Sequence, residues 1–281
     1  MSFRTALALV LGGGVMLTAC AKKPAPPAAA AAKANVVTIT ASDFAFAAPD
    51  TIPAGLTTVE LVNHGQEVHQ AVFLRIDSGK TAADLLTMMK NPDAPIPAWL
   101  TFPLGVGGIV PGDSANSTAT LTPGHYAMVC FLPSPDGTPH VAKGMVRPFE
   151  VAATSAPSAP EPASDLTITM KDYTWDLSAP PTAGTHTIRV ENVGPQLHEI
   201  QMFQMAPGKS AKDLMAWMGG GMKGPPPAKP VGGYAGLTVG LHGFFTATFA
   251  PGKYVFVCYV PDKKDNKPHM MHGMVKEITV S

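Results

Sequence analysis

Two loops of this 281-residue chain carry a cysteine, a histidine and a methionine at nearly the same spacing. Together they offer a thiolate, an imidazole and a thioether, which are soft and borderline ligands that suit copper. One more imidazole would complete the His2Cys set with a weak axial methionine that makes a blue-copper site. The loop residues are Cys130, His140 and Met145 in the first copy and Cys258, His269 and Met274 in the second.

A second imidazole is available upstream of each loop. There an asparagine precedes a histidine by six residues, with a glycine between them, and the histidines are His69 and His198. The second loop also has His272 at the position where the first has Lys143. Because a neutral imidazole can bind a metal and a protonated lysine cannot, we expect His272 to be an alternative ligand in the second half.

With these motifs the sequence resembles the cupredoxins, the plastocyanin and azurin superfamily. The shared pattern is Asn-x-Gly-x-x-x-His before a hydrophobic strand, followed by a late Cys…His…Gly-Met loop. The resemblance implies one mononuclear copper in each half and one-electron transfer between redox proteins. It also implies that the loop histidine has a ring edge near the surface as the electron port, rimmed by Val141-Ala142 and Met270-Met271.

The ligand loops are longer than is usual for a cupredoxin. Nine residues separate the cysteine from the histidine in the first loop, and ten separate them in the second. We interpret the extra residues as a small excursion that turns at Asp136-Gly137 and at Asp265-Asn266, residue types that favour turns.

The chain has three cysteines, namely Cys20 and one at the same place in each half. A disulfide within one half is therefore impossible. Cys130 and Cys258 could be buried small hydrophobes or could form a bridge between the halves. Metal ligation explains better why free thiols are kept in an oxidising compartment.

The first twenty residues have the features of a bacterial lipoprotein signal peptide. A basic residue, Arg4, precedes an apolar run, and the segment ending at Cys20 is similar to a lipobox. An ordinary signal peptide cleaved near Ala19 and a membrane anchor are the alternatives, although the run is short for a membrane span. We expect lipidation of Cys20 and a place in the bacterial cell envelope, on its periplasmic or extracellular face, with the outer membrane as one option.

Most of the remaining chain is an internal repeat, the signature of tandem homologous units. Asn63 and His69 recur at one common offset as Asn192 and His198, and Cys130 recurs as Cys258 at an offset shorter by one. The expected organisation is a signal peptide at 1–20, an Ala/Pro-rich tether at 21–34, a first domain at 35–152, a Pro/Ala/Ser linker at 153–164 and a second domain at 165–281.

Short strand signals bounded by glycine and proline fill each repeat, a pattern typical of a β-sandwich. Thr81 and Ser210 each precede an aspartate by three residues, which predicts one helix per repeat. We therefore predict an all-β fold of two tandem cupredoxin-like Greek-key β-sandwiches, each with one short helical insertion. The strands expected in the first repeat are 36–41, 57–63, 69–76, 117–121, 126–131 and 145–151.

Twenty basic and twenty acidic side chains give a formal net charge of zero, which argues against a nucleic-acid partner. A multicopper enzyme is disfavoured because such enzymes place histidines beside the cysteine, where this chain has Val129 and Phe131. We expect no enzymatic activity, and redox proteins of the envelope as partners. A copper carrier or resistance protein without redox turnover and a metal-free cupredoxin-like binding module remain alternatives.

Overall fold

The computed structural model describes residues 1–2, 32–77, 79–91 and 94–281. Cys20 and most of the tether lie outside the described residues, so the lipobox, the lipidation and the signal peptide stay predictions. Among the described residues, no helix is long and apolar enough to cross a membrane. Residues 32–281 form one compact unit that holds both repeats.

The first half is built from short strands whose buried and exposed residues alternate, as expected where one face of a sheet meets a core. In β1, for example, Val37, Ile39 and Ala41 are buried and the residues between them are more exposed. The elements are β1 Asn35–Ser42, β2 Ala45–Ala47, β3 Thr51–Pro53, β4 Gly55–Asn63, β5 His69–Ile76, α1 Ala82–Met88, β6 Leu100–Ile109, β7 Ser114–Leu121, β8 Gly124–Val129 and β9 Val146–Ala152.

The second half, residues 165–281, repeats this order without a strand equivalent to β3. Its elements are β10 Leu166–Lys171, β11 Thr174–Leu177, β12 Gly184–Asn192, β13 His198–Met205, α2 Ala211–Gly219, β14 Ala228–Leu237, β15 His242–Phe249, β16 Gly252–Val257 and β17 Val275–Val280. Both helices begin at the predicted capping boxes, with Thr81 and Ser210 as N-cap residues. The predicted all-β fold of two β-sandwiches, each with one short α-helix, is confirmed.

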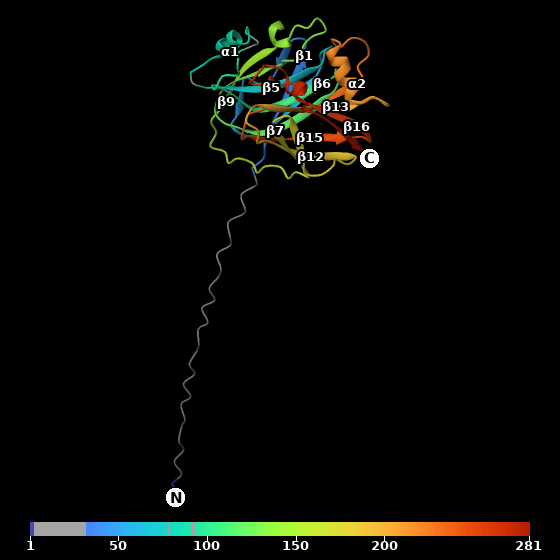
Figure 1. Ribbon diagram of the computed structural model, residues 1–281. Helices are drawn as coiled ribbons and strands as arrows, with labels where there is room; N and C mark the ends of the chain where they lie inside the picture. Colours follow the sequence, from blue (N-terminus) through green and yellow to red (C-terminus); the bar gives the residue numbers. More distant parts are fainter. Residues whose placement is uncertain (3–31, 78, 92–93) are drawn as a thin grey trace. The chain divides into compact units, whose positions relative to one another are not determined.

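Both sheets run without a break from one half into the other. Within the described residues, one sheet has the strand order β11-β10-β12-β15-β7-β4-β1-β2, and the other has β17-β16-β13-β14-β6-β5-β8-β9-β3. The halves therefore meet along two strand pairs, β6 with β14 and β7 with β15. Figure 1 shows β7 beside β15. The structure therefore joins the two domains into one body.

The seam between the halves pairs equivalent strands about a local two-fold axis. In one sheet Val106 lies opposite Tyr234, its own counterpart in the second repeat, and β6 and β14 are antiparallel. These strands are rich in glycine because the backbones come very close. A Cβ on Gly105 would lie 1.8 Å from the carbonyl oxygen of Ala235. Glycine is depleted in ordinary strands, which explains why β6 was absent from the predicted strands.

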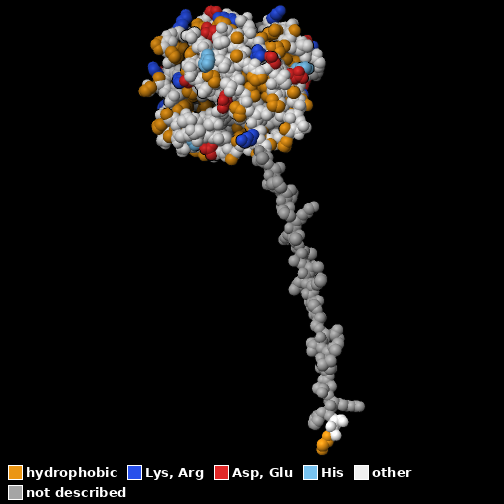
Figure 2. Space-filling model, turned by 180° about the vertical axis from the view of Figure 1, so that it is seen from behind, with side chains coloured by type: hydrophobic (Ala, Val, Ile, Leu, Met, Phe, Trp, Pro, Cys, Tyr) orange, Lys and Arg blue, Asp and Glu red, His pale blue; other side chains and the backbone are white. Residues whose placement is uncertain are grey.

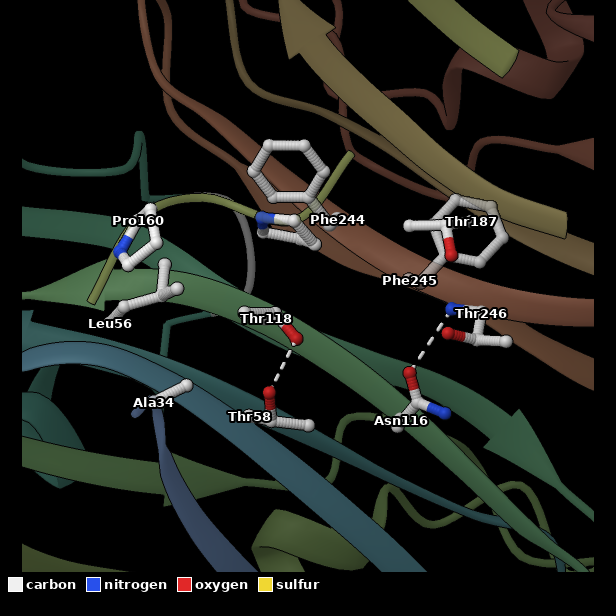
Figure 3. A pocket seen from close by; sticks show the side chains of 11 residues that line it. Ala34, Leu56, Thr58, Asn116, Thr118, Pro160, Thr187, Phe244, Phe245 and Thr246 are labelled. Atoms are coloured by element: carbon white, nitrogen blue, oxygen red, sulfur yellow. Dashed lines mark hydrogen bonds between the residues drawn. The ribbon is translucent and has the colours of Figure 1, made fainter. Parts of the chain in front are cut away.

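The linker at 153–164 crosses the same seam. Its Glu161 accepts a hydrogen bond from Arg189 at 3.3 Å and lies 2.6 Å from Nε2 of His242. Beside it, Pro160 lines a groove of about 290 Å³ at the place where β7 and β15 are neighbours in the eight-stranded sheet (Figure 3). The Asn116 side chain accepts a hydrogen bond from the backbone N–H of Thr246 across this groove, at 3.0 Å.

Two aromatic residues lie near the start of each repeat. Phe46 and Trp175 are buried in the core. Phe44 and Tyr173 are only partly buried at its edge, where they contact the loop histidines. The ring centroids are 4.9 Å apart for Phe44 and His140 and 5.5 Å apart for Tyr173 and His269.

Candidate metal centres

The strand order explains why distant residues of the first half meet at one end of its sandwich. β5 and β8 are antiparallel neighbours, with Val72 opposite Val129. The start of β5, which carries His69, therefore lies beside the end of β8, after which Cys130 follows. The turn after β1 reaches the same end, because β1 pairs in parallel with β4 and places Ala41 opposite Asn63.

The long loop after Cys130 folds back on itself and returns its histidine to the cysteine. An isolated bridge between Pro133 and Pro139 closes the excursion, and Gly137 turns it with a positive φ of 83°. The backbone N–H of His140 then donates to the carbonyl of Leu132 at 2.9 Å. The second loop closes in the same way between Pro261 and Pro268. The extra residues form the predicted excursion.

Three predicted ligands converge in the first half. Nδ1 of His69 lies 3.1 Å from Nδ1 of His140, and Sγ of Cys130 lies 3.3 Å from the latter atom. All three side chains are fully buried.

The second half repeats this geometry. Nδ1 of His198 lies 3.1 Å from Nδ1 of His269, and Sγ of Cys258 lies 3.4 Å from the latter atom. These three side chains are also fully buried. Both cysteines are free, so the alternative of a bridge between Cys130 and Cys258 does not apply.

The two predicted methionine ligands close the loops. Met145 and Met274 are buried in the same core cluster as the cysteines. Each donates its backbone N–H to the carbonyl of the loop histidine, at 2.9 Å for Met145 and 3.0 Å for Met274. Their carbonyls accept from the cysteine N–H groups. This backbone closure holds each methionine next to its His2Cys group.

Carboxylates on the outer edge of the rings orient the histidines of the first half. Nε2 of His69 lies 2.6 Å from Asp43, and Nε2 of His140 lies 2.9 Å from Glu67. Since a carboxylate accepts, each Nε2 carries the proton and donates it. Each Nδ1 is then left with a lone pair that points toward the other and toward Cys130, an arrangement that carboxylate–histidine pairs give in metal sites.

The second half keeps one of these contacts and changes the other. Nε2 of His198 lies 2.9 Å from Asp172, the counterpart of Asp43. Nε2 of His269 lies 3.6 Å from Asp262 and makes no hydrogen bond within the described residues. Asp262 itself accepts hydrogen bonds from Tyr173 at 2.5 Å and from Gln196 at 3.0 Å.

Burial determines the protonation of the ligand atoms. It lowers the pKa of His69 and His198, and it lowers the pKa of His269 to about 4, so these imidazoles are neutral near pH 7. It raises the pKa of the Cys130 thiol to about 12 and that of Cys258 well above its usual value. Without a metal both thiols are therefore protonated, and metal binding must release their protons.

Asp43 and Asp262 have lowered pKa values and carry charge. Burial on its own would raise the pKa of Asp43, but hydrogen bonds from the Gln66 N–H, the His69 ring and the Glu67 N–H lower it overall. The hydrogen bond from Tyr173 holds the pKa of Asp262 well below its usual range.

The loop histidines do not present a free ring edge, contrary to what the resemblance implied. His140 and His269 are both fully buried, and Phe44 and Tyr173 pack against them. The carboxylates cover the outer Nε2 atoms. Of the expected docking rims, Val141 and Met270 are partly buried, whereas Met271 is 66% exposed.

The structure places His272 outside the second His2Cys group. Its Nε2 lies 3.0 Å from Asp265 on the same loop, and its ring lies 5.2 Å from that of Tyr173. In the first half Lys143 makes the equivalent contact, with its Nζ 2.9 Å from Asp136.

Reasoning from sequence did not single out the carboxylates at the histidine edges. Asp43 and Asp172 occupy matched positions of the repeat, in register with the histidines that they contact. That matched placement was the available signal. Asp262 had no such signal, because the equivalent position in the first half is Ser134.

No model of a known protein family matches the sequence, and no curated protein matches it. Among solved structures, a reduced auracyanin from the photosynthetic bacterium Roseiflexus castenholzii is 25% identical, over 43% of this chain and 99% of its own, with a TM-score of 0.31. A multicopper oxidase is 16% identical over 88% of each chain, with a TM-score of 0.25. A copper nitrite reductase from Nitrosomonas europaea is 13% identical over 89% of this chain and 94% of its own, with a TM-score of 0.27.

These TM-scores are low, so the chemistry of the two groups is judged on their own donor atoms. Each group offers two imidazole nitrogens and one sulfur, all within 4.8 Å of one another. In the first half the carboxylates leave a lone pair on both Nδ1 atoms. Lone pairs that face each other in a buried site are unfavourable unless a cation lies between them. Both groups are therefore compatible with a mononuclear copper site, as the resemblance to cupredoxins implied.

Proposed function

We propose that the chain is a copper-binding protein that carries one electron at a time, with one type 1 copper in each half. The observation that supports this most strongly is the convergence of two Nδ1 atoms and one Sγ atom at a fully buried point, in both halves. A thiolate with two imidazoles and a nearby methionine is the ligand set of blue-copper centres.

The bound metal would supply a one-electron couple, in which Cu(II) accepts an electron from a reduced partner protein and Cu(I) returns it to an oxidised one. The chain's contribution is to hold the donors still. His69 and His198 begin β5 and β13, and the carboxylates fix their ring orientation. Donors held by a rigid scaffold need little rearrangement when the charge of the metal changes.

Reconstitution of the metal-free protein with Cu(II) tests this proposal. We expect two coppers per chain and an intense visible band from thiolate-to-copper charge transfer. Tight but colourless binding would instead favour a copper carrier or resistance protein without redox turnover. No binding would leave a metal-free binding module.

The copper carrier is the second candidate, and the covered loop histidines favour it. Because Glu67 and Asp262 lie against the outer ring atoms, neither loop histidine offers a free edge to an electron-transfer partner. We further propose that the chain has no enzymatic activity, since Val129 and Phe131 flank Cys130 and carry no imidazole toward a second copper.

We also propose that Cys20 is lipidated and holds the protein on a membrane of the bacterial envelope, where redox proteins would be its partners. The unaltered protein should then partition with membranes, and Cys20→Ser should move it to the soluble fraction without changing its copper spectrum. An unaltered protein that is soluble and carries no lipid would contradict this part of the proposal.

A further inference from the structure

The loop histidine of each half has a carboxylate at its Nε2 edge, but the two halves supply this carboxylate from different places. In the first half it is Glu67, which lies just before β5 and is 2.9 Å from His140. The residue equivalent to Glu67 in the second half is Gln196, an uncharged amide. There the acid is Asp262 on the ligand loop, 3.6 Å from His269.

The exchange is reciprocal. Ser134 occupies in the first loop the place that Asp262 occupies in the second, since both donate a backbone N–H across the base of the excursion at 2.9 Å. Both residues are 2% exposed. The hydroxyl of Ser134 makes no hydrogen bond within the described residues, whereas the Asp262 carboxylate accepts from Tyr173 and Gln196. The acidic residue therefore comes from a different loop in each half, and in both halves it faces the loop histidine.

A third position changes together with these two. Tyr173 donates its hydroxyl to Asp262 at 2.5 Å, and Gln196 donates to the same oxygen at 3.0 Å. The counterpart of Tyr173 is Phe44, which has no hydroxyl to offer, and Glu67 reaches His140 without one. Each half thus contains a complete set of side chains for placing one buried or half-buried negative charge beside its loop histidine.

We propose that Glu67 in the first half and Asp262 in the second are positioning residues that place a negative charge at the outer edge of the loop histidine, and that Glu67 also fixes the orientation of the His140 ring. This inference rests on the copper function proposed above. Glu67 acts by a hydrogen bond and by its charge, and Asp262 acts by its charge at 3.6 Å. A negative charge close to a buried metal stabilises Cu(II) more than Cu(I), so both residues lower the reduction potential.

The test compares variants of the full chain in which only one site can be coloured. In a Cys258→Ser background, Glu67→Gln keeps a hydrogen-bond acceptor beside His140 and removes the charge. Loss of such an outer partner typically costs about 10–100-fold in metal affinity. If Cu(II) binding alone is weakened, the reduction potential rises by about 59 mV for each factor of ten.

Two further variants of the first site distinguish positioning from a general effect of charge. Asp136→Asn removes one negative charge from an exposed place on the ligand loop of the same half, and the potential of this variant should change much less. The triple variant Glu67→Gln/Ser134→Asp/Phe44→Tyr builds the arrangement of the second half into the first, and should return the potential toward its original value. Asp262→Asn, in a Cys130→Ser background, should raise the potential of the second site.

The inference is overturned if Glu67→Gln shifts the potential no more than Asp136→Asn, or if the triple variant restores nothing. Affinity for Co(II), measured by its own absorption, separates this outcome from failure of the proposed function. If copper gives no one-electron couple, the proposed function fails. A loss of Co(II) affinity of about 10–100-fold in Glu67→Gln alone would still support the positioning role, and an unchanged affinity would refute it.

Discussion

Cys130 and Cys258 belong to separate groups, so each should contribute its own share of the copper absorption. Cys130→Ser and Cys258→Ser each delete one thiolate, which is the origin of the strong band. We expect each variant to lose about half of the visible absorption and one of the two coppers, as measured by spectroscopy and metal analysis. If either single variant were colourless, the two sites would not be independent.

His269 makes the stability of the metal-free protein depend on pH. Its pKa is lowered to about 4 in the folded state by burial, against about 6.5 in an unfolded chain. Between these values the unfolded state binds more protons, so stability is complete above pH 6.5 and falls as the pH drops toward 4. From pH 7 to pH 5 this one residue should cost about 2 kcal/mol in the free energy of unfolding.

Urea denaturation of the metal-free protein at several pH values would measure this loss. His269→Asn cannot take up the proton and should flatten the dependence, and bound copper should do the same by keeping the imidazole neutral. An equal slope in the unaltered protein and in His269→Asn would contradict the assignment.

How much of each centre could be predicted depends on what the residue does. The proposed ligands could be identified from their types, since a thiolate and imidazoles have few competing roles at matched positions of a repeat. Asp43 and Glu67 are ordinary surface residue types, and only the folded structure places them on the ring edges. Burial of His140 likewise depends on Phe44, which comes from another strand connection.

At the scale of single elements, the ligand loop after β16 bears on the role of His272. Since His272 contacts Asp265 as Lys143 contacts Asp136, His272→Lys should restore an ion pair of the first-half type. We expect the copper spectrum of the second site and its response to acid to be unchanged by this substitution. A shift of the band at the second site would instead support direct ligation by His272.

Strand β6 depends on its glycines. A Cβ at Gly105 would lie 1.8 Å from a backbone oxygen of β14, and backbone cannot move aside as a flexible side chain can. Gly105→Ala should therefore lower the melting temperature and cost about 3 kcal/mol. Gly219→Ala is the control, because a Cβ there meets nothing within 4 Å and alanine favours the helix. Equal melting temperatures for the two variants would contradict this account of the seam.

Among the strands, β5 was predicted with its observed bounds because its apolar run starts at a motif histidine and contains Val72, Phe73 and Ile76. β6 and β14 were missed for the opposite reason. Their glycines weaken the local signal, and the need for them arises from a contact between halves that lie far apart in the sequence.

At the scale of the whole molecule, the strand register separates the two centres. His69 lies opposite Ile109, Ile109 lies opposite Val231, and His198 lies opposite Leu237. Three strand spacings and six residues along a strand put the two centres about 25 Å apart. The two coppers should therefore exchange electrons with partners at separate places, and their spectra should add.

The charges on the surface are too evenly mixed to steer a redox partner by a strong electrostatic field. On the face in Figure 2, acidic and basic side chains lie scattered among hydrophobic ones, and the formal net charge is zero. Association with a redox partner should thus depend only weakly on ionic strength. A rate of electron transfer that falls steeply with added salt would contradict this expectation.

The continuity of the sheets predicts that the linker is not needed to hold the halves together. A protease site placed within 154–158 and then cut should leave both fragments in one particle on size exclusion, because β6–β14 and β7–β15 remain paired. Denaturant should separate the fragments. If they elute separately without denaturant, the seam is weaker than the structure indicates.

The two-fold seam also bears on how the two centres could come to differ. Val106 facing its own counterpart Tyr234 is the geometry of an isologous contact between identical subunits. The chain thus has the form of a homodimer whose two subunits have been joined end to end in one polypeptide. In a true homodimer a single gene fixes both centres at once. Fusion removes that constraint, and it allows one centre to place its acid at Glu67 and the other at Asp262 while the contact between them is preserved.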